Sequence, residues 1–179
     1  VIFVILFILA ARFFQNSGIF FSFDRAVLNF FISLRHDRLT DVVLVITFLG
    51  DIKFVLPASA ILLIWFWLSK RIFHLLLLFF SVAVSAGLVF LLKDFFMRFR
   101  PGIELQLVSE NSFSFPSGHA MMAIAFWGAL AYLLSKNFSE QWQKAVVIAG
   151  GCALIFVISI SRLYLGVHWP TDILGSWIL

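Results

Sequence analysis

Three polar stretches interrupt an otherwise apolar sequence, and each carries residue types that can hold or attack a phosphoryl group. They are KDFFMRFRP (93–101), FPSGH (115–119) and SRLYLGVHWPTD (161–172). Lys93, Arg100 and Arg162 are cations, and we expect no acid, Glu110 included, to face them. Like charges repel, so a cluster of these three predicts a ligand of high negative charge density. The planar fork of arginine binds two phosphate oxygens at once, which favours phosphate.

The second stretch predicts an anion cradle. Ser117 and Gly118 begin a predicted helix, whose first backbone N–H groups lack partners and whose dipole is positive at this end. Glycine lets the backbone approach a ligand closely, and the serine adds a hydroxyl donor. Together these features are typical of a phosphate-binding helix start.

Two histidines can supply the chemistry. His168 and Asp172 are four residues apart, with Pro170 suited to the first turn of a helix. This spacing lets the carboxylate accept the Nδ1 proton, so that the Nε2 lone pair serves as a nucleophile or base. His119 comes from a different helix and is free to give or take a proton. A metal site is the competing use of these residues, but the metal would lie among three cations, so we expect no metal and no cofactor.

The elements that position these residues are membrane helices. The chain has 179 residues, of which 63% are hydrophobic and 12% charged, about half the charged fraction of a soluble domain. We therefore predict an integral membrane protein with an all-α fold and one domain over 1–179, apparently truncated at both ends. A net charge of +4 without a basic stripe indicates no nucleic-acid partner. Cys152 lies inside an apolar run, which predicts a buried thiol.

The hydropathy pattern predicts a bundle of six transmembrane helices. The spans are 1–13, 53–68, 72–92, 119–135, 144–161 and 170–179. Segment 24–35 has an apolar face between charged ends, which predicts an interfacial helix between the first and second spans. Segment 42–51 is too short to span and ends at a Gly-Asp break, so we interpret it as a partly inserted lead-in.

The connections between spans predict which polar stretches meet. Because the chain crosses the membrane twice between 118 and 162, all three polar stretches should lie at the same face. The short connections 69–71 and 136–143 carry Lys70, Arg71 and Lys136, which places them on the cytoplasmic side. The opposite side carries more Lys and Arg in total, but we assign several of those to the site. The site should therefore face away from the cytoplasm.

The motifs resemble a known signature. Lys93 followed after six residues by Arg100-Pro101, then Pro116-Ser117-Gly118-His119, then Ser161-Arg162 with His168 and Asp172 resemble the three-part signature of the type 2 phosphatidic acid phosphatase family. That family also includes vanadium haloperoxidases. Among its members, the chain looks most like bacterial phosphatidylglycerophosphate or undecaprenyl-pyrophosphate phosphatases, which implies a protein of the bacterial cytoplasmic membrane.

The resemblance implies a role for each position. His168 would attack phosphorus to form a phosphohistidine, with Asp172 orienting it, and His119 would protonate the leaving oxygen and then activate water. The phosphoryl oxygens would be held by five residues: Lys93, Arg100, Ser117, Gly118 and Arg162. No metal or cofactor is implied. Arg98 falls outside the signature, and we expect it to face a lipid headgroup or an interfacial phosphate.

Several functions fit the same residues. A membrane lipid phosphate or pyrophosphate phosphatase would pass the phosphoryl group to water, whereas a lipid phosphotransferase would pass it to another acceptor. The predicted spans argue against a haloperoxidase, because those relatives are soluble. A non-enzymatic lipid-binding protein of this fold would be expected to have lost a signature residue, and none is missing. The partners expected are the lipid bilayer and a lipid phosphate substrate.

Overall fold

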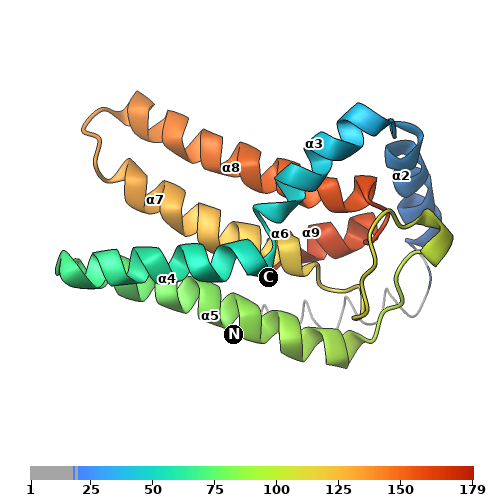
Figure 1. Ribbon diagram of the computed structural model, residues 1–179, viewed down its shortest axis with the longest axis horizontal. Coiled ribbons are helices and arrows are strands. Elements are labelled where there is room, and N and C mark those ends of the chain that lie inside the picture. The colour runs from blue at the N-terminus through green and yellow to red at the C-terminus, as the bar shows by residue number, and fades with distance from the viewer. Residues whose placement is uncertain (1–17, 19) are drawn as a thin grey trace.

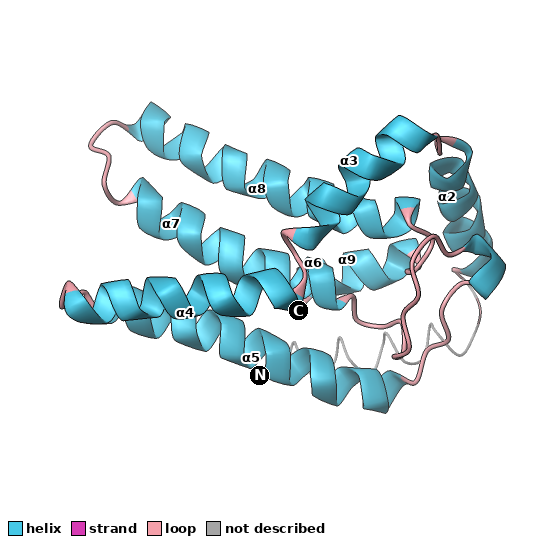
Figure 2. Ribbon diagram, viewed as in Figure 1, coloured by secondary structure: helices cyan, strands magenta, loops and turns pink. Residues whose placement is uncertain are grey.

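The computed structural model describes residues 18 and 20–179, and within them the chain is helical with no strand (Figures 1 and 2). The predicted span 1–13 lies outside the described residues. The helices are α2 (Phe21–Ser33), α3 (Asp37–Phe48), α4 (Ile52–Leu68), α5 (Ile72–Phe96), α6 (Gly118–Ala123), α7 (Ala129–Ser135), α8 (Gln141–Tyr164) and α9 (Pro170–Ile178). A 3-10 turn, η1 (Ile103–Leu105), and a π turn, η2 (Ile124–Gly128), complete the described elements.

Three helical segments in the described part of the chain are long and apolar enough to cross a membrane: Ile72–Phe96, Gly118–Ser135 and Gln141–Tyr164. They correspond to the predicted spans 72–92, 119–135 and 144–161, and each of them is longer than predicted. The predicted spans 53–68 and 170–179 are helices α4 and α9, of 17 and 9 residues. An α-helical span needs about 20 residues, so length alone does not assign these two as membrane-crossing.

The outer surfaces of the long helices are apolar, as a lipid-facing surface requires. Phe90 on α5 is 70% exposed and Val146 on α8 is 62% exposed. Cys152 is exposed on α8, so the prediction of a buried thiol was wrong. In a membrane protein, a residue within an apolar stretch of sequence can face lipid just as readily as it can be buried inside the protein.

The core lies between α4, α5 and the segment from α6 to α7. Its largest buried cluster comprises Val55, Phe66, Leu78, Val82, Met122, Phe126, Ala129 and Leu133. The π turn η2 interrupts the 118–135 helix at mid-length, and there Trp127 Nε1 donates to the carbonyl of Leu49 at 3.0 Å. Trp127 also stacks on Phe54, with ring centroids 6.0 Å apart. These contacts fix η2 against the turn between α3 and α4 and against the start of α4.

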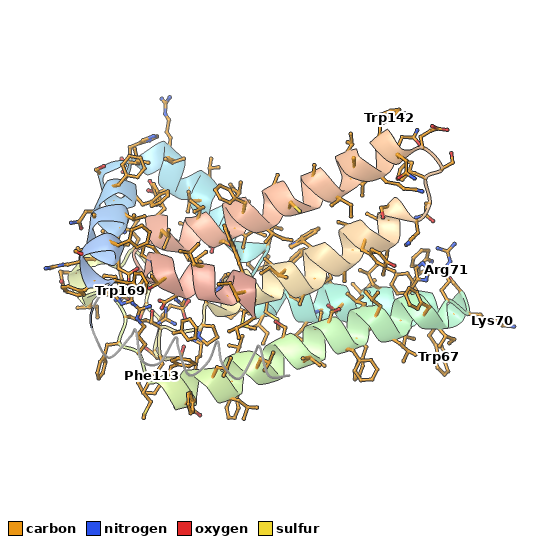
Figure 3. The ribbon with its side chains drawn as sticks, turned by 180° about the vertical axis from the view of Figure 1, so that it is seen from behind. Trp67, Lys70, Arg71, Phe113, Trp142 and Trp169 are labelled. Atoms are coloured by element: carbon orange, nitrogen blue, oxygen red, sulfur yellow. The ribbon has the colours of Figure 1, made fainter. Side chains whose placement is uncertain are left out.

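The polar segments gather at one end of the bundle. In Figure 1 the α4–α5 and α7–α8 connections lie at one end, and the loop 97–117 and the end of α8 lie at the other. Helix α2 lies across this second end and packs against α8 and α9. The tryptophans and cations labelled in Figure 3 show the same division, with Lys70, Arg71 and Trp142 far from Phe113 and Trp169.

Candidate active site

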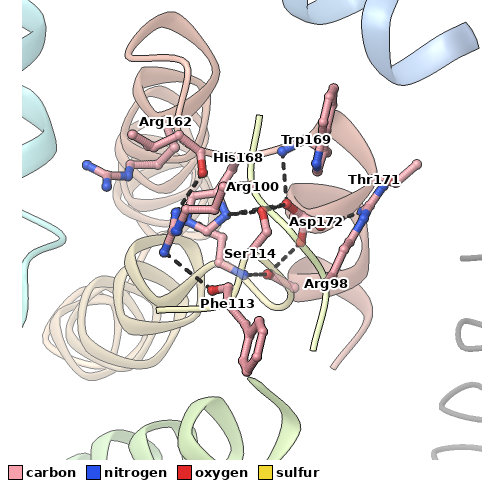
Figure 4. A network of polar contacts seen from close by, with 12 residues as sticks. Arg98, Arg100, Phe113, Ser114, Arg162, His168, Trp169, Thr171 and Asp172 are labelled. Atoms are coloured by element: carbon pink, nitrogen blue, oxygen red, sulfur yellow. Dashed lines mark hydrogen bonds and ion pairs between the residues drawn. The ribbon is translucent and has the colours of Figure 1, made fainter. Parts of the chain in front are cut away.

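His168 and Asp172 form the centre of the site, and the local fold makes their pairing unavoidable. Helix α8 ends at Tyr164, the chain turns at Gly166, whose φ of +75° favours glycine, and α9 begins at Pro170. The two side chains are then one helical turn apart, with Nδ1 of His168 3.4 Å from Oδ2 of Asp172. Asp172 also accepts from the backbone N–H of Trp169 at 2.9 Å, which caps α9. Both residues are buried, and Figure 4 shows the polar side chains around them.

The contacts of His168 fix its tautomer. Arg100 Nη1 lies 3.2 Å from Nε2 of His168, and a guanidinium can only donate hydrogen bonds. Nε2 therefore carries the lone pair, and the proton is on Nδ1, facing Asp172. Burial lowers the pKa of His168 to about 3, although Asp172 opposes this shift. The ring is thus neutral at ordinary pH, with the lone pair of Nε2 directed at the guanidinium of Arg100.

Lys93 and Arg100 are held mainly by backbone carbonyl groups, from the loop that follows α5 and from Val167. Lys93 Nζ donates to the carbonyl of Phe113 at 2.5 Å and to Ser112 Oγ at 2.9 Å. Arg100 Nε donates to the carbonyl of Ser112 at 2.7 Å, and its Nη1 donates to that of Val167 at 2.6 Å. Carbonyls satisfy the N–H groups without cancelling the positive charge, so both side chains remain suited to binding an anion.

Glu110 corrects the expectation that the cations face no acid. Its Oε1 is 2.5 Å from Arg162 Nη2, and its Oε2 is 3.7 Å from Arg100 Nη2. Burial lowers the pKa of Arg100, and the carboxylate of Glu110 opposes that shift. In this structure Glu110 thus offers its two oxygens to the same two arginines that were predicted to bind phosphate.

Arg162 is held between this acid and α3. Its side chain is 2% exposed, and Nη1 donates to Thr47 Oγ1 at 2.8 Å. Among the described residues, its Nε is one of the few buried polar atoms without a hydrogen-bond partner. A buried guanidinium with an unused N–H retains donor capacity for a ligand oxygen.

The Pro116–His119 segment starts α6 as predicted, but its contacts are partly structural. Ser117 is fully buried and caps the helix, accepting from the N–H of Ala120 at 3.5 Å. The N–H of Ser117 itself donates to Ser176 Oγ at 2.9 Å. A Cβ added at Gly118 would lie 3.6 Å from Val89, an ordinary contact, so packing within the protein does not demand glycine here. A requirement for close ligand approach at Gly118 stays a prediction.

His119 has an acidic neighbour that the sequence did not reveal. Its Nε2 lies 3.6 Å from Oδ2 of Asp51, which caps α4 through its other oxygen at 2.8 Å from the N–H of Lys53. A Cβ at Gly50 would lie 3.2 Å from the carbonyl oxygen of His119, so the Gly-Asp break brings α4 directly against α6. In the sequence, the Gly50-Asp51 break indicated only where one segment ends and the next begins. It did not identify Asp51 as a partner of His119.

Arg98 does not face lipid, which corrects a second expectation. Its guanidinium points inward and bonds both Asp172 and Asp24, the latter at 2.6 Å.

Ser114 is a site residue that the sequence analysis missed, although it lies only three residues before Ser117. Its hydroxyl bonds Asp172 Oδ2 and lies 3.4 Å from His168 Nδ1. The four hydrogen-bond donors that face the carboxylate oxygens of Asp172 thus all come from the protein itself.

A cavity of about 540 Å³ opens beside these residues, lined by side chains that include Phe90, Lys93, Arg100, Glu110 and Phe113. Its lining combines charged and aromatic side chains, which suits a ligand with an anionic head and an apolar tail. Among the described residues no group of three or more His, Cys, Asp or Glu is arranged to hold a metal ion.

A family model described as the PAP2 superfamily matches residues 74–179, which include all three polar stretches. The chain belongs to the PAP2 superfamily. Phosphatidylglycerophosphatase B of Bacillus subtilis strain 168 is 36% identical over 160 residues, covering 88% of this chain and 78% of that protein. An undecaprenyl-diphosphatase of Sulfolobus acidocaldarius is 33% identical, covering 69% of this chain and 57% of that protein.

Solved structures of PAP2 relatives agree with this fold. A transmembrane PAP2-type phosphatidylglycerolphosphate phosphatase from Bacillus subtilis superposes with a TM-score of 0.87 and 32% identity, covering 98% of this chain and 88% of that chain. LpxE of Aquifex aeolicus superposes with a TM-score of 0.68 and 25% identity, covering 87% of this chain and 89% of that chain. With the long apolar helices, these relatives identify this PAP2 chain as an integral membrane protein.

Proposed function

We propose that this PAP2 protein is a phosphatase of membrane lipid phosphates or diphosphates, acting through a phosphohistidine. One observation carries the proposal: Asp172 holds the Nδ1 side of His168, while Arg100 lies 3.2 Å from Nε2. A phosphoryl group bound by Arg100 would lie next to the lone pair that attacks it. The names of the relatives, which are a phosphatidylglycerophosphatase and an undecaprenyl-diphosphatase, support this class of substrate.

In the first step Nε2 of His168 attacks phosphorus, and the bond from phosphorus to the lipid oxygen breaks. His119 donates its proton to the leaving oxygen. The carboxylate of Asp51 lies 3.6 Å from the Nε2 atom of this histidine. The phosphorylated ring of His168 carries a positive charge, which Asp172 stabilises from the Nδ1 side.

In the second step a water molecule attacks phosphorus and gives a proton to His119. The P–N bond breaks, inorganic phosphate leaves, and His168 returns to its neutral form. Lys93, Arg100 and Arg162 would stabilise the charge on the phosphoryl oxygens in both transition states, together with Ser117 and the N–H of Gly118. No step requires a metal, so activity should persist in EDTA.

We further propose that residues 1–179 form one domain with six spans, of which α4 and α9 contribute two. Helix α2 would lie in the interface, because it lies across the polar end of the bundle in Figure 1 and exposes Phe21, Phe23 and Phe30. The polar end would face away from the cytoplasm of a bacterial cell. Lys70, Arg71 and Lys136, at the opposite end, support this orientation.

Phosphate release by the purified protein in detergent tests the proposal, using phosphatidylglycerophosphate, phosphatidic acid and undecaprenyl diphosphate, each with and without EDTA. We expect release from at least one lipid, and none from the His168→Ala variant. Loss of activity in EDTA that a divalent metal restores would contradict the metal-free mechanism. Transfer of the phosphoryl group to an added lipid alcohol, without release of phosphate, would identify a phosphotransferase instead.

A further inference from the structure

Arg98 lies between two buried carboxylates that come from distant parts of the chain. Its Nη2 is 2.6 Å from Oδ2 of Asp24 on α2, and its Nη1 bonds Oδ1 of Asp172 on α9. Both carboxylates are 0% exposed, whereas the arginine side chain is 17% exposed. Since Arg98 occupies Oδ1 of Asp172, the other oxygen of that carboxylate is the one directed at His168 (Figure 4).

Asp24 also fixes the first turn of α9. Its Oδ1 accepts from the backbone N–H of Thr171 at 2.9 Å, and its Oδ2 accepts from the hydroxyl of Thr171 at 2.7 Å. That hydroxyl in turn accepts from Arg98 Nη1 at 2.8 Å. The N–H groups of a first helical turn have no partner within the helix, so an outside carboxylate both satisfies this one and sets where the turn lies. The turn carries Asp172.

The charges of Asp24, Arg98 and Asp172 affect how well Asp172 supports the nucleophile, His168. With Asp24 present, one guanidinium is shared by two carboxylates, and the group keeps a net negative charge. Without Asp24, the positive charge of Arg98 would be balanced by Asp172 alone. Asp172 would then be a weaker acceptor for the Nδ1 proton and a weaker stabiliser of the phosphorylated ring of His168.

We propose that Asp24 and Arg98 are positioning residues for the nucleophile: Asp24 holds Arg98 and α9 so that Oδ2 of Asp172 faces Nδ1 of His168. The inference rests on the proposed phosphohistidine chemistry and adds to it a residue from α2. Asp24 lies outside the segment 74–179 that the family model matches. Helix α2 therefore takes part in building the site as well as covering it.

Two variants test the proposal, each with a matched control on α3. Asp24→Asn removes the charge and keeps the shape, and Arg98→Lys keeps the charge but cannot bridge two carboxylates in the same way. Asp41→Asn and Arg38→Lys make the same changes at exposed positions. With phosphorus-32-labelled phosphatidylglycerophosphate in detergent and rapid quenching, formation and hydrolysis of the phosphoenzyme are measured separately.

We expect both variants to form the phosphoenzyme roughly 10- to 100-fold more slowly, as for a misplaced reacting group, with KM little changed and hydrolysis near the wild-type rate. The controls should behave as wild type. Because Asp24 acts through Asp172, Asp24→Asn should have almost no further effect in an Asp172→Asn background. Nitrogen-15 NMR of labelled histidine should also show less of the Nδ1–H tautomer of His168 in Asp24→Asn.

Each outcome decides one question. If the wild-type protein releases no phosphate from any lipid, the proposed function fails, and the tautomer measurement alone then tests the arrangement of the residues. If the wild type is active but both variants form the phosphoenzyme at the normal rate, the positioning role is wrong. A third set of results would show that Asp24 and Arg98 are structural anchors only. In that set both steps slow equally, the effects of Asp24→Asn and Asp172→Asn on the rate add in the double variant, and the tautomer of His168 is unchanged. Should Asp24→Asn fail to fold, Arg98→Lys and the more conservative Asp24→Glu carry the same comparison.

Discussion

Replacing Glu110 with glutamine should make the protein bind anions more tightly. The carboxylate of Glu110 lies 2.5 Å from Arg162 and 3.7 Å from Arg100, where the proposed phosphate oxygens would bind. A phosphate that enters must displace this carboxylate or share the arginines with it. Glu110→Gln keeps the size of the side chain and removes the competing charge.

The size of the effect follows from the geometry. A hydrogen bond to a charged group contributes about 1.5–3 kcal/mol, which corresponds to roughly 10- to 150-fold in affinity. The side chain of Glu110 is 28% exposed, so solvent screens part of the interaction and the lower figure applies. We therefore expect the inhibition constants for vanadate and inorganic phosphate to fall about tenfold. The KM should fall too, without a rise in kcat, because product phosphate is also held more tightly.

The assay is hydrolysis of phosphatidylglycerophosphate in detergent at constant ionic strength, with vanadate or phosphate as the inhibitor. Glu104→Gln is the matched control, because it removes the same charge from an exposed position in the same loop. An unchanged or raised inhibition constant in Glu110→Gln, with the control unaffected, would show that Glu110 does not compete with the bound anion. The carboxylate would then serve to hold Arg162 in place.

Three further predictions concern the chemistry and the topology. His168→Ala should form no phosphoenzyme, and His119→Ala should lower the rate by roughly 10²–10⁴ as measured by phosphate release. Burial lowers the pKa of His168 to about 3, so its nitrogen-15 NMR signals should remain those of a neutral ring at about pH 5, where an ordinary histidine would be about 97% protonated. A protonated ring at that pH would contradict the buried site. In a Cys152→Ser background, Glu104→Cys should react with an impermeant reagent in intact cells and Ser139→Cys only after permeabilisation; the reverse pattern would overturn the orientation but not the chemistry.

The sequence was sufficient to predict the parts of the site that follow from local spacing. The four-residue interval from His168 to Asp172 leads directly to the observed pairing, because α9 begins between them. Parity of the predicted spans likewise placed the three polar stretches at one end, and the contact of Arg100 with His168 confirms that the first and the third meet. Hydropathy located the long helices because each one has to satisfy its own backbone in lipid.

What the sequence could not reveal depends on side-chain direction. Arg98 and Arg100 are two residues apart in a loop with no regular period, so nothing in the sequence shows that one guanidinium faces Asp24 and the other His168. The same holds for Glu110, whose loop folds back over Arg162. Loop residues are positioned by tertiary contacts, and periodicity carries no information about them.

The helices before the matched family segment bear on each part of the proposed mechanism. Asp24 on α2 bonds Arg98 and so reaches Asp172, Thr47 on α3 accepts from Arg162, and Asp51 at the start of α4 lies beside His119. These residues carry none of the proposed chemistry themselves, but each contacts a group that does, or that group's partner. The proposed nucleophile just before α9, an anion-binding cation on α8 and a proton donor on α6 have to be held in register at once. In this protein that register is set by contacts from α2 to α4, so substitutions there should alter rates although they lie outside the signature motifs.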